Sequence, residues 1–422
     1  MIQPVVVIRT PEIRAHHDGK EIAAEVHIAG VRHILWFRLP ADIPADIRMD
    51  PFVITLLATA MNLGADVIAE GDLSPAVVEA IPRFQTIFHR WYPALRIARV
   101  SGYSLATADA PDGARRTVSF FSGGVDSFHT ILRHRDRIDD AILVHGFDFS
   151  LENTLLRNTV RTRLKQAADQ LNKPLIEVET NSREITEPHA AWPRHQYGNA
   201  LAGVGHLLGR HANRVLIPSS DTYECLIPWG SHPLTDTLWQ SERLAIEHDG
   251  ADCSRLEKVR FLSAHDAALH HLRVCWRNPG NAYNCGVCEK CVRTQLELLA
   301  SGLLERCPIF SETITAQKIA EIVIPAQFGE YYVEILRALR ETGAHQEIIH
   351  TLASVVERYQ QKQLGQQLAA SALLHADVSE VREGILRHEQ TLMRILLTRG
   401  HAHVLRLWMR TLRADLARRM RR

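Results

Sequence analysis

The middle of the chain alternates short apolar runs with longer stretches of helical periodicity. The apolar runs occupy residues 117–121, 141–145, 174–179 and 214–218. Helical spacing of apolar positions occupies residues 128–134, 156–171 and 197–208 between them. Continuous apolar runs are typical of strands buried on both faces, and strands alternating with helices indicate a parallel sheet. The pattern therefore predicts an α/β fold for residues 115–300.

Parallel strands bring the loops after their carboxyl ends to one edge of the sheet, where ligands bind in such folds. The loops predicted at this edge are 122–127, 146–148, 180–183 and 219–221. Each places polar or glycine residues directly after an apolar run, so we expect them to build the functional site.

Residues 1–113 predict a small α+β accessory domain. Strand-like runs occupy residues 5–8, 23–28 and 31–37. Gly30 predicts a hairpin turn, Asp50 predicts the N-cap of a helix, and Gly64 predicts the end of that helix. The stretch 111–114 is typical of a linker.

Residues 301–422 predict a helical region. Apolar residues recur at helical spacing over 330–340, 347–358 and 378–397. The final helix is expected to carry eight arginines: Arg399, Arg406, Arg410, Arg413, Arg418, Arg419, Arg421 and Arg422. This end is either a site for nucleic acid or an acidic partner, or the solvated end of an amphipathic helix; we expect the latter.

The segment Ser122-Gly123-Gly124-Val125-Asp126-Ser127 carries the first chemical signal. A glycine-rich turn between a strand and a helix lets backbone N–H groups approach a phosphate, and the helix N-terminus favours negative charge. Asp126 can hold Mg²⁺, which prefers one or two carboxylates together with phosphate oxygens. The alternative is an ordinary turn. The segment is not a Walker A loop, because it lacks the G-x-x-x-x-G-K-[ST] pattern.

Four cysteines carry the second signal. Cys275, Cys285, Cys288 and Cys291 follow the pattern C-x9-C-x2-C-x2-C. Four thiolates at this spacing suit a closed tetrahedral zinc site, which would be structural because no position is left for water. Disulfides and an iron–sulfur cluster are the alternatives, and we favour zinc.

Composition and charge limit the classes of binding partner that we expect. The 422 residues carry 49 basic and 48 acidic side chains, for a net charge of +1, so no general attraction to nucleic acid or membranes is expected. No secretory leader or membrane-length apolar run is evident. We expect a cytoplasmic protein; the sequence leaves its oligomeric state open, a homodimer included.

The loop and the cysteines, in this order, resemble the PP-loop ATP pyrophosphatases, and among them 7-cyano-7-deazaguanine synthases. The resemblance covers roughly residues 115–310 and implies an adenine nucleotide alpha hydrolase-like core. It implies that zinc binds the four cysteines and that the loop binds ATP phosphates through Ser122, Gly123, Gly124, Asp126 and Ser127. Asp126 and Ser127 would also serve catalysis. The second loop normally contacts adenine in this family, which nominates His145, Gly146 and Phe147.

The resemblance fails on the acceptor side of the expected pocket. The synthases carry a D-Y-S-G-Y-P-D-C-R-like segment where this chain reads Ser219 to Tyr223 and then Pro228 to Asp236. In this respect the chain is more similar to the longer synthase-like proteins of bacterial antiphage operons, such as Qat and type IV CBASS. That branch implies a deazaguanine joined to an amine of a protein partner encoded nearby, rather than released as a nitrile.

Further site residues are nominated by chemistry and proximity. Candidate cationic clamps are Arg183, Arg194, Lys290 and Arg293, of which Lys290 and Arg293 follow the cysteines and would be rigidly held. Tryptophans that could stack on a deazapurine are Trp192, Trp229, Trp239 and Trp276. Trp229 is favoured, and His232 and Asp236 are placed in the same substrate pocket. His232, His248 and Asp249 are possible acid–base groups, although 248–250 is equally readable as a turn.

These observations predict a zinc-containing, Mg²⁺- and ATP-dependent ligase that adenylates the carboxylate of a 7-deazaguanine. A nitrogen nucleophile then displaces AMP, giving an amide, a nitrile or a protein conjugate, in an antiviral defence setting. The alternatives are a nucleotide-sensing scaffold without catalysis and a PP-loop enzyme that modifies tRNA.

Overall fold

The computed structural model describes residues 4–107 and 116–366. The chain divides into compact units of residues 1–355 and 356–422. Of the second unit, only residues 356–366 are described, and they are helical. The expected linker at 111–114, the helix expected at 378–397 and the eight arginines lie outside the described residues.

Five parallel strands form the centre of the first unit. They are β9 (Arg116–Phe120), β10 (Asp140–His145), β11 (Leu175–Thr180), β12 (Ala212–Pro218) and β13 (Ala245–Asp249). Their order in the sheet is β13-β12-β9-β10-β11, and each neighbouring pair is parallel. This is the doubly wound order, in which the first and fourth strands, β9 and β12, flank the switch point. The predicted α/β class is confirmed, and the four predicted strands lie near their expected positions.

The fifth strand was missed because its sequence gives no apolar run. β13 reads Ala-Ile-Glu-His-Asp and lies at the sheet edge, and Ile246 is its only buried apolar residue. The interpretation of 248–250 as a turn is wrong for His248 and Asp249, which end the strand. The turn begins at Gly250, whose φ is +90°.

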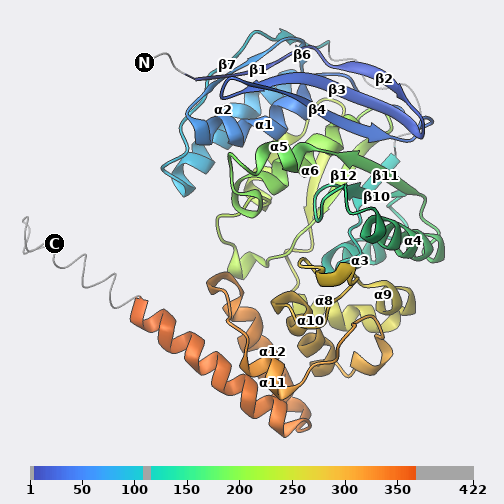
Figure 1. The fold of residues 1–422 in the computed structure, drawn as a ribbon, viewed down its shortest axis with the longest axis vertical. Coiled ribbons are helices and arrows are strands. Elements are labelled where there is room, and N and C mark those ends of the chain that lie inside the picture. Colours follow the sequence, from blue (N-terminus) through green and yellow to red (C-terminus); the bar gives the residue numbers. More distant parts are fainter. Residues whose placement is uncertain (1–3, 108–115, 367–422) are drawn as a thin grey trace, which may run out of the picture. The chain divides into compact units, whose positions relative to one another are not determined.

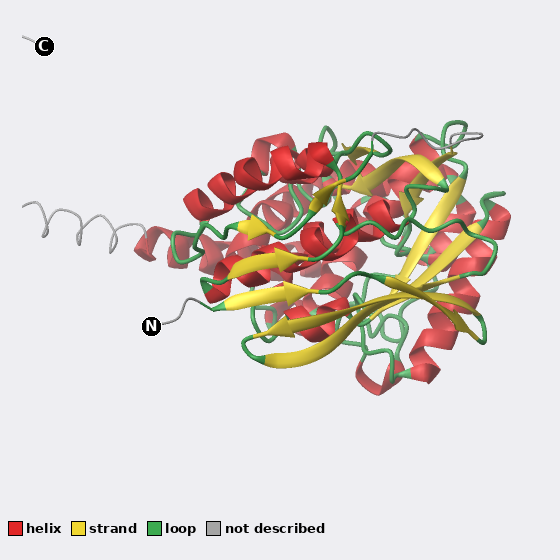
Figure 2. Ribbon diagram, turned by 90° about the horizontal axis from the view of Figure 1, so that it is seen from above, coloured by secondary structure: helices red, strands yellow, loops and turns green. Residues whose placement is uncertain are grey.

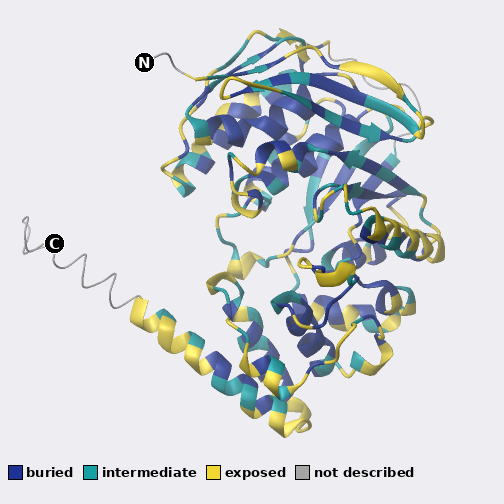
Figure 3. Ribbon diagram, in the orientation of Figure 1, coloured by how far each residue is buried: buried dark blue, intermediate teal, exposed yellow. Residues whose placement is uncertain are grey.

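Helices cover both faces of the parallel strands (Figures 1 and 2). α3 (Val125–Arg133), α4 (Thr154–Gln170), α8 (Arg255–Phe261) and α9 (Asp266–His271) share one core, which Ala141 and Leu143 of β10 enter. α1 (Asp50–Leu63), α2 (Pro75–Trp91) and α6 (Tyr197–Leu207) share the other, which Ile142 enters. Alternate residues of one strand thus enter opposite cores, as a pleated strand requires. The exposed stripe of α4 is visible in Figure 3.

The N-terminal strands extend the same sheet. They are β1 (Val5–Ile8), β2 (Glu12–His16), β3 (Gly19–Ile28), β4 (Val31–Leu39), β5 (Asp66–Ala69) and β7 (Val100–Ser101). β4 pairs antiparallel with β11 through Glu179 opposite Arg38 and Thr180 opposite Phe37, which makes one 11-stranded sheet. The section expected as an accessory domain therefore shares a sheet and a core with the strands that follow. The predicted hairpin is confirmed: Ala29 and Gly30 both have positive φ between paired β3 and β4.

The two ends of α1 compare the capping residues predicted from the sequence with those in the structure. Gly64 adopts the left-handed conformation after α1, as predicted. Asp50 is not the N-cap; it is the first helical residue, and its carboxylate accepts hydrogen bonds from Ser74 N–H at 3.1 Å and Ser74 Oγ at 3.0 Å. A long-range partner therefore takes the oxygens that a cap would use.

Further strands and α-helices lie in the first unit. They are β6 (Asp72–Leu73), β8 (Ser104–Leu105), α5 (Ser182–Thr186), α7 (Pro233–Asp236), α10 (Glu289–Ala300), α11 (Ala316–Ala320) and α12 (Gly329–Thr342). Among the residues described, none of the helices has both the length and the apolar character needed to cross a bilayer.

A buried histidine on α3 predicts a pH dependence of stability. Burial, with Lys258 nearby, lowers the pKa of His129 from 6.5 to about 4. Between these values the unfolded chain binds a proton that the folded chain does not, so stability is complete above pH 6.5 and falls as the pH drops toward 4. His129→Phe keeps a ring against Phe261 and should remove on the order of 3 kcal/mol of this loss. Chemical unfolding at several pH values measures the free energy of unfolding of the wild type and of His129→Phe. If this free energy fell equally with falling pH in both proteins, His129 would not be the source of the pH dependence.

Candidate functional site

The S-G-G-V-D-S segment joins β9 to α3 at the switch point of the sheet. Gly123 has φ +76°, and a Cβ there would lie 2.4 Å from Leu164 Cδ2. Its carbonyl accepts a hydrogen bond from the backbone N–H of Arg273 at 2.7 Å. Ser127 Oγ donates to the Gly124 carbonyl at 3.0 Å, and Ser122 Oγ accepts from the Gly124 N–H at 3.4 Å. The glycines therefore permit a tight turn that the rest of the fold fixes.

Replacing Gly123 by alanine should cost more than replacing a comparable glycine. Gly302 has φ +69° but nothing within 4 Å of an added Cβ, so Gly302→Ala carries only the backbone strain. Gly123→Ala adds the clash with Leu164, which we expect to cost about 1–3 kcal/mol more. Denaturant unfolding of the two variants gives the difference directly; equal destabilisation would show that the loop adapts freely.

A cavity opens beside this turn, and we call it the loop cavity. Three of the four predicted loops line it, through Ser122, Gly124, Asp126, Ser127, Phe147, Asp148 and Ser220. Its wall also includes Tyr197 of α6, Arg255 of α8, Arg273 and Trp276 near the first cysteine, and Lys290 of α10. The edge predicted from the alternation of strands and helices in the sequence is thus where the cavity lies.

Asp126 is held by two cations. Arg255 Nη1 lies 3.0 Å and Lys258 Nζ 3.3 Å from its carboxylate oxygens. Burial opposes ionisation of Asp126, but the charges of Lys258 and Arg255, with that of Lys290, outweigh it and lower its pKa. Arg255 also meets Glu297 at 3.1 Å, deeper in the protein. Asp126 is therefore an anion whose position is fixed by α8.

Arg273 presents unused hydrogen-bond donors. Its side chain is 4% exposed, and Nη1 donates to Asp148 Oδ2 at 2.7 Å. Its Nε and Nη2 are buried and have no partner among the described residues. Buried donors are nearly always satisfied in folded proteins, so a guanidinium with free donors on a cavity wall indicates an anionic ligand.

Lys290 and Arg293, the predicted clamps, have different surroundings. Lys290 lines the loop cavity, and its ammonium has no ion pair within the part of the chain that is described. Burial and nearby Arg255 lower the pKa of Lys290, although Asp148 and Asp126 counteract them. Arg293 instead donates to Glu289 at 2.8 Å, with its guanidinium over the rings of Phe328 and Tyr331. Lys290 thus faces the loop cavity, whereas Arg293 is fixed in a second chamber.

That second chamber, which we call the aromatic chamber, adjoins the loop cavity. The two share Asp126, Asp148, Tyr197, Ser220, Arg255, Trp276 and Lys290. The chamber adds Trp192, Trp229, Phe328 and Tyr331 to the wall, with Arg183, Asp221 and Arg293. Three of the four nominated tryptophans therefore lie here, and the fourth, Trp239, is fully buried in the core. Arg194 is exposed and lines none of these cavities.

A third, smaller cavity, which we call the histidine pocket, is lined by His232 but not by Asp236. It is lined by Tyr197, Ser220, Asp221, Trp229, Ser231, His232 and His248, among others. His232 Nδ1 accepts from the Leu234 N–H at 3.0 Å. Asp236 stands behind the wall, where its carboxylate accepts from His248 Nδ1 at 2.8 Å. Asp236 thus contacts the wall of the pocket from behind.

The three nucleotide-base candidates are separated by the structure. Phe147 lines the loop cavity. His145 is buried on the sheet, and its Nε2 meets Glu177 at 3.1 Å. Gly146 has φ +98°, and a Cβ there would lie 2.1 Å from the Thr180 carbonyl oxygen, so it serves close packing beside an outer groove. Phe147 alone of the three reaches the cavity.

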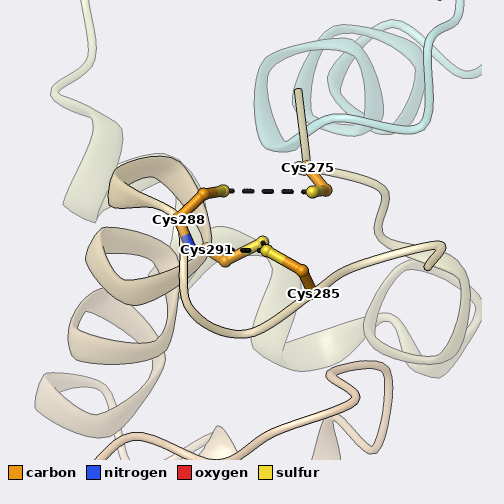
Figure 4. A group of neighbouring side chains, drawn as sticks. All are labelled: Cys275, Cys285, Cys288 and Cys291. Carbon is orange, nitrogen blue, oxygen red and sulfur yellow. Dashed lines mark hydrogen bonds between the residues drawn. The ribbon is translucent and has the colours of Figure 1, made fainter. Parts of the chain in front are cut away.

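The four cysteines converge (Figure 4). All are buried, and their sulfur atoms lie within 4.8 Å of one another. The Cys275–Cys288 and Cys285–Cys291 sulfur distances are both 3.9 Å, too long for disulfides. A tetrahedron with zinc–sulfur bonds of about 2.3 Å separates its sulfurs by about 3.8 Å, so the arrangement fits zinc. Backbone N–H groups of Asn278 and Cys288 donate to Cys275 and Cys285 sulfurs, as expected around thiolates.

The cysteine cluster also positions the cationic wall. Cys275 lies two residues after Arg273 and next to Trp276, and Lys290 lies between Cys288 and Cys291 at the start of α10. Gly286, with φ +77°, makes the turn between the ligands and leaves no room for a side chain, because Glu312 O would lie 2.1 Å away. A metal held by these thiolates would therefore fix Arg273, Trp276 and Lys290 at the cavity.

Sequence reasoning missed several residues of the site. Arg255 lies within a capping box formed by Ser254 and Glu257, and Lys258 directly follows it; the S-x-x-E signature predicts the start of α8. Asp148 lay within a nominated loop but was not singled out. Tyr331, whose hydroxyl donates to Asp221 at 2.6 Å, had no signal beyond its helical spacing.

The fold and the site together define an α/β protein with a cation-lined cavity at its sheet switch point and a buried four-cysteine cluster able to hold a metal ion. Comparison with protein-family models, curated proteins and solved structures gave no match.

Proposed function

We propose that this protein is an ATP-dependent enzyme that adenylates the carboxylate of a 7-deazaguanine and transfers the acyl group to a nitrogen nucleophile. The observation that carries the proposal is the free donors beside the S-G-G-V-D-S turn: Nε and Nη2 of Arg273 have no partner, and Lys290 has no ion pair, among the described residues. Donors without partners suit the phosphates of ATP, and the doubly wound strand order supports a nucleotide at this edge.

Each part of the loop cavity has a role in this proposal. The loop N–H groups, Arg273 and Lys290 hold the triphosphate, and Phe147 packs on the base. Asp126 and Ser127 are the residues that would hold Mg²⁺, which supplies charge neutralisation when bound with the phosphates. Zinc in the four-cysteine cluster is structural, because its four thiolates leave no open position.

The aromatic chamber receives the carboxylate substrate. Trp192, Trp229 and Trp276 offer faces for a planar deazapurine, and Arg293 offers a fixed cation for its carboxylate. The carboxylate oxygen attacks the α-phosphorus, the bond to the bridging oxygen breaks, and pyrophosphate leaves with the electron pair. The protein contributes mainly positioning and charge stabilisation, as in other phosphoryl-type transfers.

The nitrogen acceptor completes the reaction. Ammonia would give an amide, which activation by a second ATP would convert to a nitrile with loss of the amide oxygen, whereas an amine of a protein partner would give a conjugate. The N-terminal strands and the helices after residue 300 add surface that a small-molecule synthase does not need, which favours the protein partner. From the resemblance to the proteins of antiphage operons, we further propose that the reaction serves antiviral defence in the cytoplasm.

The first test determines which bond of ATP is broken, from the products that form. The wild type with Mg²⁺, zinc, 7-carboxy-7-deazaguanine and ammonium should form AMP and pyrophosphate, and Asp126→Ala should form neither. A matched control is Asp252→Ala, which removes an exposed partner of Arg133 on the surface. Formation of ADP and phosphate by the wild type would contradict the proposal.

A nucleotide-sensing scaffold is the second candidate, and one observation favours it. Arg255 and Lys258 already neutralise Asp126, so this carboxylate can stabilise the cavity without holding a metal. A scaffold would bind ATP without releasing pyrophosphate under any of these conditions, which the same experiment distinguishes.

A further inference from the structure

A buried histidine–aspartate pair lies at the histidine pocket. His248, at the carboxyl end of β13, donates from Nδ1 to Asp236 Oδ2 at 2.8 Å, and the two side chains are 3% and 2% exposed. Ser231 Oγ donates to the same carboxylate oxygen at 2.6 Å. The carboxylate therefore fixes both the orientation and the tautomer of the ring, and leaves the lone pair on Nε2.

The second ring nitrogen of His248, Nε2, makes no hydrogen bond to the described residues. Nε2 of His248 is buried and lacks a hydrogen-bond partner among the described residues, although His248 lines the histidine pocket. This pocket shares Ser220 with the loop cavity, and Asp221 and Trp229 with the aromatic chamber. A buried basic nitrogen without a partner, next to both chambers, indicates that a ligand supplies the missing donor.

The strand register places the pair on the acceptor side. His248 lies opposite Ile217 of β12, and β12 pairs in turn with β9. Neighbouring strands are about 4.8 Å apart, so His248 lies about 10 Å across the sheet from β9, which carries the loop. This separation suits a group that acts on the acceptor, beyond the phosphates.

Other titratable groups nearby are less suited to take a proton. His232, which precedes α7, uses Nδ1 to accept from the Leu234 N–H, and its ring packs edge-on against Trp91. Burial raises the pKa of both Asp221 and Tyr197, so each favours its neutral form. Asp249 is bonded on the opposite face of β13, to Thr130 and His134.

We propose that His248 is the general base of the nitrogen transfer, with Asp236 as its positioning residue; this role rests on the proposed function. The nitrogen nucleophile enters as an ammonium group and loses one proton to His248 Nε2, and Asp236 stabilises the resulting imidazolium. The freed lone pair attacks the acyl carbon of the adenylate. The carbon–oxygen bond to AMP then breaks, AMP leaves with the electron pair, and the second nitrogen proton passes to water.

The test separates proton removal from adenylation. His248→Asn is compared with the wild type in ATP–pyrophosphate exchange with 7-carboxy-7-deazaguanine, and in transfer to ammonium, to glycinamide and to hydroxylamine. Hydroxylamine is uncharged near neutral pH and needs no base before attack. The variant should keep exchange and hydroxamate formation, lose about 100-fold or more in transfer to the amine that the wild type uses, and recover as the pH rises.

A matched histidine provides the control. His134→Asn removes a similar pair, with Asp249, from a position that lines none of the three cavities, and should leave every readout unchanged. Asp236→Asn should show the same selective loss as His248→Asn, with a shifted pH profile. Equal loss with hydroxylamine and amines, loss of exchange in a folded variant, or full activity would each overturn the role of His248. A wild type without exchange would overturn the adenylating function itself, and the base with it.

Discussion

Replacing Arg273 by alanine weakens ATP binding by about 100-fold in our account, while the protein stays folded. The guanidinium has two buried nitrogens without partners, and a charge-assisted hydrogen bond to phosphate is worth about 1.5–3 kcal/mol. Asp148, its present partner, is 44% exposed and remains solvated after the substitution, so little stability is lost. Calorimetric titration with a non-hydrolysable ATP analogue measures the effect.

Two further variants make this prediction specific. Arg273→Lys keeps the charge but loses the planar fork, and should recover only part of the affinity. Arg163→Ala removes a guanidinium that packs over Tyr283 and lines none of the three cavities, so affinity should not change. Unchanged binding in Arg273→Ala would mean that the free donors serve another ligand.

Replacing Cys288 by serine should have the largest effect on stability. Losing one thiolate breaks the tetrahedral metal site, and losses of metal sites are among the few single changes that exceed about 4 kcal/mol. ATP affinity should fall as well, because the cluster holds the segments that carry Arg273 and Lys290. Metal analysis should find one zinc per chain in the wild type, with thermal unfolding and ATP titration as the other readouts.

A second buried cysteine supplies the control. Cys307 lies outside the cluster, and its thiol donates to the Leu269 carbonyl at 3.0 Å, a bond that serine can also make. Cys307→Ser should therefore keep the metal and the affinity for ATP. If Cys288→Ser kept its metal and its stability, the four cysteines would not be a metal site. If the wild type contained iron and sulfide instead of zinc, the cysteines would hold an iron–sulfur cluster.

Local patterns in the sequence predicted where the candidate site lies, but they did not predict which side chains contact one another there. Apolar runs identified the parallel strands, and the rule for ligands at their carboxyl ends then placed Asp126, Phe147 and Asp148 near one edge. No such rule indicates that Arg255, 129 residues from Asp126, becomes its ion-pair partner. That contact depends on how α8 packs against α3, which no short-range pattern encodes.

Three other differences between the predicted and the observed structure depend on long-range packing and on which face of its strand a side chain takes. In a strand buried on both sides, apolar residues face both cores, so the sequence does not show which face His145 takes. The structure turns His145 toward Glu177 and away from the cavity. Asp236 was expected to touch substrate, but the structure pairs it with His248 from a strand that the sequence did not reveal. The pairing of β4 with β11 likewise joins segments more than a hundred residues apart, as Arg38 opposite Glu179 shows.

The central claim is that a carboxylate attacks the α-phosphorus of ATP. The most direct measurement uses 7-carboxy-7-deazaguanine labelled with a heavy oxygen isotope in its carboxylate, followed by mass spectrometry of the AMP formed with a nitrogen donor. We predict that AMP carries one labelled oxygen, because the carboxylate oxygen stays with AMP when nitrogen displaces it. Unlabelled AMP would show that water attacks instead, and no AMP at all would show that the cavity binds a ligand without this chemistry.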